Sequence, residues 1–235
     1  MDLDTLFSVD GKVALVTGGS RGIGLMISEG LVRSGVRVYI SSRKAEVCDA
    51  VTAQLSEVGE CISIPADLSG PEGVERVVAE LGERERELHL LVNNAGATWG
   101  APLEDFPDDA WDKVLSTNVK AIFGLTTGLL PLLRAAASEQ DPARVINIGS
   151  IDGIRVPETE NYPYAASKAA VHMLTRQLAH RLTRDHVTVN AIAPGPFPSK
   201  MMAFLLDAEG GEELVARSVP LGRIGRPDDV VGAVL

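Results

Sequence analysis

The chain has 235 residues, of which 45% are hydrophobic, and its formal net charge is −10 at pH 7. This length and composition are typical of one globular domain with an ample core. The excess of acidic residues argues against nucleic acid or an anionic membrane surface as the main partner.

Strand-like and helix-like segments alternate along the chain without internal repeats or a break in composition. The expected strands are 12–17, 36–41, 60–65, 88–92, 144–149 and 187–192. The expected helices are 22–34, 44–57, 71–86, 107–137 and 162–184, with more helix from 200 onward. This alternation predicts an α/β fold, a Rossmann-type doubly wound parallel sheet with right-handed crossovers in a single domain spanning 1–235.

The first strand runs directly into a glycine-rich loop, in which Gly18, Gly22 and Gly24 precede a helix. Glycines let the backbone approach a diphosphate, and the start of a helix offers unpaired N–H groups and the positive end of its dipole. The spacing is Gly-x-x-x-Gly-x-Gly and differs from the Gly-x-Gly-x-x-Gly of the larger dehydrogenases. We interpret the loop as a dinucleotide phosphate site; the alternative is a turn without a ligand.

The second strand ends in Ser42-Arg43-Lys44, with no carboxylate. In NAD-binding proteins of this architecture an acidic residue there accepts hydrogen bonds from the adenosine ribose. Arg43, together with Arg21 in the glycine loop, instead suits a 2′-phosphate, because a guanidinium pairs with phosphate oxygens in a forked geometry. The sequence therefore favours NADP(H). The alternative is two surface arginines at the starts of solvated helices.

A serine, a tyrosine and a lysine have a spacing that suggests chemistry. Ser150 follows the apolar strand 144–149, whose carboxyl end is where open α/β sheets place their sites. Tyr164 and Lys168 are four residues apart on an expected helix and so share one face. A free phenol has a pKa of about 10, and a fixed cation beside it favours the phenolate. We expect Lys168 to lower the pKa of Tyr164.

At this point the chain resembles the short-chain dehydrogenase/reductase family over nearly its whole length. The matching segments are 17–24, Asp67-Leu68, Asn93-Asn-Ala-Gly96, Asn118, Ser150, Tyr164 with Lys168, and Pro194-Gly195. Segments 93–96, 143–150 and 193–201 look most like NADPH-dependent 3-oxoacyl (β-ketoacyl) reductases of lipid metabolism, including those associated with rhamnolipid synthesis. The resemblance implies an oxidoreductase acting on CH–OH groups.

The resemblance also implies a set of cofactor-binding residues. Asp67 would accept a hydrogen bond from the adenine amino group, segment 94–96 would pass the adenosine ribose, and the backbone N–H of Phe197 would meet the nicotinamide carboxamide. The full set is Gly18, Ser20, Arg21, Gly22, Ile23, Gly24, Ser42, Arg43, Asp67, Leu68, Asn94, Ala95, Gly96, Tyr164, Lys168, Pro194, Gly195 and Phe197. Asn93 has an alternative structural role, tying neighbouring strands, and 194–198 has one as a stiff turn.

For the reaction, the resemblance assigns four residues. Ser150 would hydrogen-bond the substrate carbonyl, and Tyr164 would donate a proton to its oxygen as NADPH delivers hydride to its carbon. Lys168 would hold the nicotinamide ribose and, together with the cationic oxidised nicotinamide ring, lower the pKa of Tyr164. Asn118 would anchor a water that links Lys168 to solvent and resupplies protons. Tyr162 is a second phenol nearby, but its fourth following residue is Ala166, so we interpret it as a pocket or packing residue.

The substrate is less well determined than the chemistry. Residues from about 197 to 217 resemble a substrate lid, with Met201, Met202, Phe204, Leu205, Leu206 and Leu214 as apolar members. These side chains suit an acyl chain, or they pack the lid against the body. We expect reduction of a 3-oxoacyl thioester, carried on acyl carrier protein or coenzyme A. The alternatives are another ketone or alcohol, such as a sugar, steroid or xenobiotic, and a non-catalytic NADPH-sensing scaffold.

The expected partners are further copies of this chain and an acyl carrier. Similar proteins pair helices 107–137 and 162–184 in a four-helix interface, so we expect a homodimer or homotetramer. Arg134, Arg181 and Arg184 are a candidate basic patch for an acidic carrier, or simply a solvated face.

Two cysteines without metal spacing, no signal peptide and no apolar stretch long enough for a bilayer predict a cytoplasmic protein without a metal site. Family members continue past 223–227 into a helix, a seventh strand and Asp-Gly-Gly. The expectation is that the sequence is truncated at Leu235 or lacks an edge strand.

Overall fold

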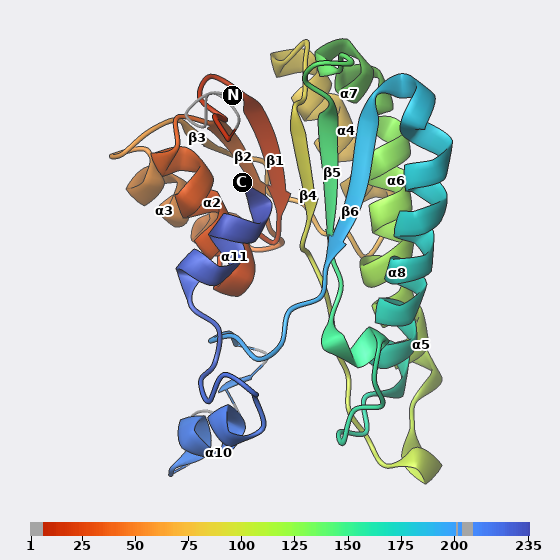
Figure 1. Cartoon of the computed structure of the whole chain (residues 1–235). Coiled ribbons are helices and arrows are strands. Elements are labelled where there is room, and N and C mark those ends of the chain that lie inside the picture. Colours follow the sequence, from red (N-terminus) through yellow and green to blue (C-terminus); the bar gives the residue numbers. More distant parts are fainter. Residues whose placement is uncertain (1–6, 201, 204–208) are drawn as a thin grey trace.

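A computed structural model describes residues 7–200, 202–203 and 209–235. Six strands form one sheet in the order β3-β2-β1-β4-β5-β6, with every pairing parallel (Figure 1). They are β1 Val13–Thr17, β2 Arg37–Ser41, β3 Cys61–Ser63, β4 Leu90–Asn93, β5 Ala143–Ile148 and β6 Val187–Ile192. The order reverses between β1 and β4, which makes their carboxyl ends the topological switch point of a doubly wound sheet. The predicted Rossmann-type fold is confirmed.

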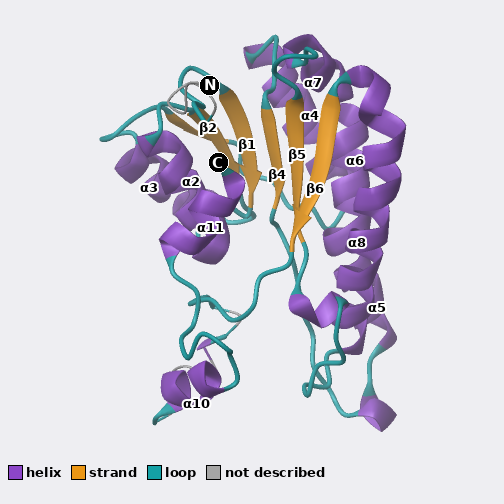
Figure 2. Cartoon of the chain, in the orientation of Figure 1, coloured by secondary structure: helices purple, strands orange, loops and turns teal. Residues whose placement is uncertain are grey.

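Helices cover both faces of the sheet (Figure 1). One face carries α2 Gly22–Arg33, α3 Ala45–Leu55 and α11 Pro227–Val234. The other carries α4 Pro71–Arg84, α5 Asp108–Leu115, α6 Ala121–Gly128, α7 Leu130–Ala136 and α8 Tyr162–Leu182. The short helix α10, Gly211–Arg217, lies beyond the carboxyl ends of the strands (Figure 2).

The core is divided by the sheet into two layers. Residues of β1 alternate between them: Leu15 packs with the helices α4, α6 and α8, whereas Ala14 and Val16 pack with α2 and α11. All five residues of β1 are buried. This burial on both sides explains why the central strands are continuous apolar runs without alternation.

The expectation of one helix over 107–137 is wrong. A π-helical segment, Ser116–Lys120, separates α5 from α6, and a break at Leu129 separates α6 from α7 with a bend of 55°. Pro131 explains the break, because proline has no N–H to donate to the carbonyl one turn earlier and its ring crowds that turn. The predicted strand 60–65 likewise shortens to β3, although the backbone N–H groups of Ile64 and Ala66 still donate to the carbonyls of Ile40 and Ser42.

Among the described residues, no single helix is long and apolar enough to cross a membrane; the bent pair Asp108–Gly128 and Leu130–Ala136 meets those criteria by length and composition only.

β6 is one edge of the sheet, and within the described ranges no strand pairs with its outer side. A shallow groove of about 350 Å³ follows this edge, with His186, Thr188 and Asn190 in its lining.

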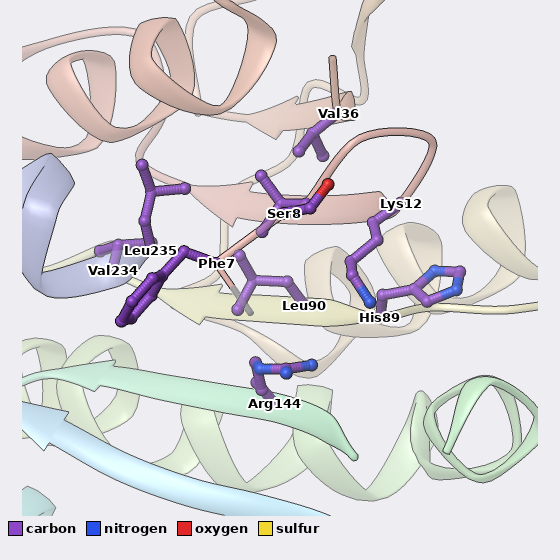
Figure 3. A pocket seen from close by; sticks show the side chains of 10 residues that line it. Phe7, Ser8, Lys12, Val36, His89, Leu90, Arg144, Val234 and Leu235 are labelled. Atoms are coloured by element: carbon purple, nitrogen blue, oxygen red, sulfur yellow. The ribbon is translucent and has the colours of Figure 1, made fainter. Parts of the chain in front are cut away.

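His89 lies at the amino end of the strands, just before β4, and its hydrogen bonding favours the neutral form. Its Nδ1 accepts a hydrogen bond from the backbone N–H of Val13 at 3.1 Å. Lys12 and Arg144 lie beside it around a small cavity of about 20 Å³ (Figure 3). Burial lowers the pKa of His89, and the charge of Lys12 lowers it further. Protonation of His89 would therefore break the hydrogen bond from Val13 and place a second positive charge near Lys12.

This geometry predicts that the protein loses stability in mild acid. A histidine with a lowered folded-state pKa binds more protons when unfolded, so its contribution is intact above its unfolded value of about 6.5 and is lost as the pH falls below it. We expect the free energy of unfolding, measured in urea, to be lower at about pH 5.5 than at about pH 7.5. His89→Asn should reduce this difference, because the amide oxygen can accept from Val13 without titrating. The exposed His180→Asn variant is the control, and an unchanged pH dependence in His89→Asn would contradict the assignment.

Candidate active site

The glycine loop and the segment after β4 meet at the switch point, where Thr17 ties them together. The Thr17 hydroxyl accepts hydrogen bonds from the backbone N–H of Asn94 at 2.9 Å and of Ala95 at 3.0 Å. The Asn94 side chain donates back to the Thr17 carbonyl at 2.9 Å and to that of Gly18 at 3.3 Å. Segment 94–96 therefore has a fixed position against the loop.

The backbone of the loop requires its glycines. Gly18 and Gly22 have φ values of 66° and 53°, which side chains rarely adopt. A Cβ at Gly24 would collide with the Gly18 carbonyl and the Asn94 amide. The first turn of α2 contains no acidic residue. Its unpaired N–H groups and dipole thus offer a site for an anion.

Gly24→Ala tests this packing. The added methyl should overpack the loop, destabilise the protein by about 1–3 kcal/mol and weaken coenzyme binding. Gly82→Ala on α4 is the matched control, since no atom lies within 4 Å of the added Cβ. Alanine in a helix should be neutral or stabilising there, by up to about 1 kcal/mol. Thermal unfolding and coenzyme titration measure both effects, and equal behaviour of the two variants would refute the close approach at Gly24.

Ser42 and Arg43 directly follow β2, and Arg21 lies in the glycine loop just before α2. The Ser42 hydroxyl is buried and has no hydrogen-bond partner in the described part of the chain. Arg43 and Arg21 are exposed, and neither forms an ion pair with another described residue. Two available guanidinium groups and an unsatisfied hydroxyl fit a phosphate ester, because such a group accepts hydrogen bonds from all three.

Asp67 and Leu68, which are expected to lie near the adenine, differ in the exposure of their side chains. Asp67 is exposed, and its carboxylate accepts a hydrogen bond from the backbone N–H of Ser69 at 3.0 Å. The side chain of Leu68 is not part of the cleft surface: it is 5% exposed and packs in the core with Ile64. The sequence could not show that the Leu68 side chain is buried, because the packing of the strand and the core decides which way this side chain points.

The segment after β6 closes the site from the other side. The Pro194 carbonyl accepts a hydrogen bond from Ile151 at 3.2 Å, which joins this segment to the turn after Ser150. A Cβ added at Gly22 would touch Ser199 at 3.2 Å, so the segment also reaches the glycine loop. Phe197 packs its ring against Gly225. Ser20 is buried and Ile23 is partly buried in the same region.

Ser150, Tyr164 and Lys168 come together at the carboxyl end of β5. The Ser150 hydroxyl lies close enough to Tyr164 to lower its pKa, and it accepts a hydrogen bond from the backbone N–H of Asp152 at 3.1 Å. The ammonium of Lys168 lies 5.5 Å from the centre of the Tyr164 ring. Lys168 is 5% exposed and donates to the Ile148 carbonyl at 2.7 Å.

In the protein without coenzyme, Lys168 is not among the groups that shift the pKa of Tyr164. Burial raises the pKa of Tyr164; the Ser150 hydroxyl opposes this shift, and the charge of Asp152 adds to it. Burial also lowers the pKa of Lys168 to about 8. Desolvation disfavours both the phenolate of Tyr164 and the ammonium of Lys168, and the helical spacing of the two residues does not reveal this effect.

Asn118 lies in the π-helical segment with a fully buried side chain. Its amide oxygen accepts from the Ala97 N–H at 2.8 Å, and its amide nitrogen donates to the Ala97 carbonyl and to the Ser167 hydroxyl, both at 2.9 Å. The side chain therefore clamps the end of segment 94–97 to α8. π-helical turns occur often at functional sites.

Several polar contacts that support the site had no clear counterpart in the sequence. Thr17 was part of the matching segment 17–24, and Ser167 lies between Tyr164 and Lys168, yet the hydrogen bonds of both depend on the fold. Asn93 does tie neighbouring strands, as one interpretation held, by donating to Asn147 of β5 at 2.9 Å. Asn147 donates in turn to Thr175 of α8 at 2.9 Å.

Other candidates do not join the site. The Tyr162 hydroxyl donates to Glu160 at 3.3 Å, and its ring packs edge-on against Phe106. Arg134 is engaged in a two-bond ion pair with Asp185. Arg181 and Arg184 lie near the far end of α8, roughly 25 Å along the helix from Tyr164. Of the expected lid, Met201 and Phe204, Leu205 and Leu206 lie outside the described residues, and Leu214 on α10 is 68% exposed.

Comparison with known proteins agrees with this geometry. Residues 12–210 match the family model of the short chain dehydrogenases. The chain is 48% identical to a rhamnolipids biosynthesis 3-oxoacyl-[acyl-carrier-protein] reductase of Pseudomonas aeruginosa, over 97% of this chain and 90% of that protein. It is 31% identical to a 5-keto-D-gluconate 5-reductase of Escherichia coli, over 99% of this chain and 90% of that protein.

Solved structures show the same likeness. Pseudomonas aeruginosa RhlG in its NADP active-site complex superposes with a TM-score of 0.94 at 48% identity, covering 97% of this chain and 89% of that one. A 3-oxoacyl (acyl-carrier-protein) reductase of Agrobacterium tumefaciens with NADP bound gives 0.89 at 31% identity, covering 100% and 90%. With its parallel sheet, glycine loop and Ser150–Tyr164–Lys168 group, the chain belongs to the short-chain dehydrogenase family.

Proposed function

We propose that this oxidoreductase reduces a 3-oxoacyl thioester to the 3-hydroxyacyl thioester with NADPH. The observation that carries the proposal is the convergence of Ser150, Tyr164 and the buried Lys168 at the carboxyl end of β5, beside the glycine loop. The similarity at 48% identity to a 3-oxoacyl-[acyl-carrier-protein] reductase supports the substrate class. The similarity to RhlG with NADP supports the coenzyme.

The residues present fit NADP(H). The N-terminus of α2 and the glycines at 18, 22 and 24 would hold the diphosphate, with Ser20 and Ile23 in the same loop. The unsatisfied Ser42 hydroxyl and the guanidinium groups of Arg21 and Arg43 would hold the 2′-phosphate. When bound, the coenzyme supplies the hydride that reduces the carbonyl carbon.

Segments on either side of this loop would hold the rest of the coenzyme. Asp67 would bind adenine, and the backbone beside Leu68 would lie next to it. Segment 94–96 would pass the adenosine ribose. Pro194, Gly195 and Phe197 would line the nicotinamide, next to the turn after Ser150.

The protein's own groups would carry the proton. Ser150, whose hydroxyl lies next to Tyr164, would orient the substrate carbonyl toward that phenol. Tyr164 would donate its proton to the carbonyl oxygen. Its raised pKa keeps it protonated at neutral pH, which is the form a proton donor needs. Lys168 would hold the nicotinamide ribose and favour the phenolate once the proton has left.

Asn118 would contribute to proton resupply through its backbone. Its side-chain amide is already engaged with Ala97 and Ser167. A backbone carbonyl of the π-helical turn Ser116–Lys120 would bind the water that links Lys168 to solvent.

The same proposal includes the expected lid, assembly and location. Residues of about 197–217 would cover the substrate as part of the single coenzyme-binding domain of 1–235, and exposed Leu214 supports an apolar role for α10.

Phe123 on α6 and Met173 on α8 are 51% and 54% exposed, which supports a homodimer or homotetramer through these helices. We also propose that the enzyme is cytoplasmic, as the free thiols of Cys48 and Cys61 suggest, and that its substrate is carried on acyl carrier protein or coenzyme A.

The deciding experiment is turnover of a short 3-oxoacyl thioester with NADPH, compared with 5-keto-D-gluconate. We expect oxidation of NADPH with the thioester and formation of the 3-hydroxyacyl product. Turnover of the sugar acid alone would replace the substrate class and leave the reductase chemistry. NADPH binding without turnover of any carbonyl compound would favour a sensing scaffold.

A further inference from the structure

Asp152 occupies a fixed position next to the candidate reaction centre. It lies in the short helical turn Ile151–Gly153 that follows Ser150, and its backbone N–H donates to the Ser150 hydroxyl at 3.1 Å. The turn is anchored at both ends. Ile151 donates to the Pro194 carbonyl at 3.2 Å, and a Cβ added at Gly153 would meet the Lys168 backbone at 2.6 Å. The turn therefore has little freedom to move Asp152 away from Ser150.

The carboxylate of Asp152 is a negative charge without a partner. It is partly exposed, and within the described ranges it takes part in no ion pair and no side-chain hydrogen bond. Its charge nevertheless reaches Tyr164, whose pKa it raises. The ammonium of Lys168, the nearest cation on α8, is directed to the Ile148 carbonyl. Arg155, three residues along, is exposed.

A charge in this place hinders the proposed chemistry, because it opposes the phenolate that Tyr164 becomes after giving up its proton. It can be useful only through its effect on the substrate. A 3-oxo acid carries its own carboxylate two carbons from the ketone. With the ketone held by Ser150, whose hydroxyl accepts from the Asp152 N–H, that carboxylate would lie in the neighbourhood of Asp152. In a thioester that carboxyl carbon is neutral. Like charges in a partly buried site repel strongly, and such repulsion is a means of rejecting a competing ligand.

We propose that Asp152 is a specificity-determining residue, which admits neutral 3-oxoacyl thioesters and excludes free 3-oxo acids. This inference rests on the proposed function and names the form in which the substrate arrives. It makes activation of the acid as a thioester a condition of reduction. The class of reaction that supplies the substrate is then one that releases a thioester, and not one that releases a free acid.

The test compares two substrates that differ only in this charge: 3-oxohexanoate and its N-acetylcysteamine thioester, each with NADPH. We expect the parent to reduce the thioester efficiently and the free acid poorly. Asp152→Asn keeps the backbone N–H to Ser150 and removes the charge. It should raise kcat/KM for the free acid by about 10- to 100-fold and change that for the thioester by less than about threefold.

Matched variants separate charge from shape. Asp152→Glu keeps the negative charge and should still exclude the free acid. Glu158→Gln removes another exposed carboxylate from the same loop and should leave both substrates unaffected. An unchanged ratio of acid to thioester efficiency in Asp152→Asn would overturn the inference. Turnover of neither compound by the parent would overturn the proposed function, and the inference with it.

The pH profile supplies a readout that a merely structural role would not move. Burial has the largest effect on the pKa of Tyr164, and the groups that also shift it are Ser150 after β5 and Asp152 in the following turn. Lys168 faces the Tyr164 ring from one turn along α8. Removing the Asp152 charge favours the phenolate, so the proton-donating phenol is lost at lower pH. The alkaline limb of kcat/KM for thioester reduction should therefore shift to lower pH in Asp152→Asn, and stay in place in Asp152→Glu.

Discussion

Tyr164→Phe is expected to lower kcat for reduction by about 10²- to 10⁴-fold, the range that a positioned proton donor contributes. The ring remains beside Lys168 and only the hydroxyl is lost, so the affinity for NADPH should be nearly unchanged. Stopped-flow turnover with a 3-oxoacyl thioester measures the first quantity, and fluorescence titration of NADPH the second. Near-parental turnover of Tyr164→Phe would show that another group is the proton donor.

Lys168→Ala should differ from Tyr164→Phe in one respect. Because Lys168 is proposed to hold the nicotinamide ribose as well as to favour the phenolate, its loss should weaken NADPH binding and slow turnover together. Tyr162→Phe is the control for both, since Tyr162 binds Glu160 and packs on Phe106. That variant should retain parental activity and affinity.

Arg43→Ala is expected to weaken NADPH binding by about 10- to 100-fold, because a charge-assisted hydrogen bond contributes about 1.5–3 kcal/mol. NADH has no 2′-phosphate, so its affinity should change far less. Isothermal titration with each coenzyme gives both dissociation constants. Arg33→Ala, at the far end of α2 in an ion pair with Glu29, should affect neither. Equal losses for the two coenzymes would mean that Arg43 shapes the loop and does not bind the phosphate.

Much of the fold was predictable because its elements are encoded by residues near one another in the chain. The apolar run of β1, the glycines that follow it and the start of α2 are a continuous segment, and each has a local physical cause. The helical spacing of Tyr164 and Lys168 is equally local. The one helix expected over 107–137 was wrong because a hydrophobic pattern continues across Pro131, whereas the backbone hydrogen bonds do not.

The sequence by itself determined the kind of fold. It also determined that the site lies at the carboxyl ends of the strands, and which residue types are found there. Tertiary structure decided how those residues behave. It placed Leu68 in the core, engaged the Asn118 amide with Ala97 and Ser167, and paired Arg134 with Asp185. It also decided that the pKa of Tyr164 rises, and that the charge of Asp152 contributes to this rise. Burial, distance and hydrogen-bond partners depend on segments far apart in the chain, and no local pattern specifies them.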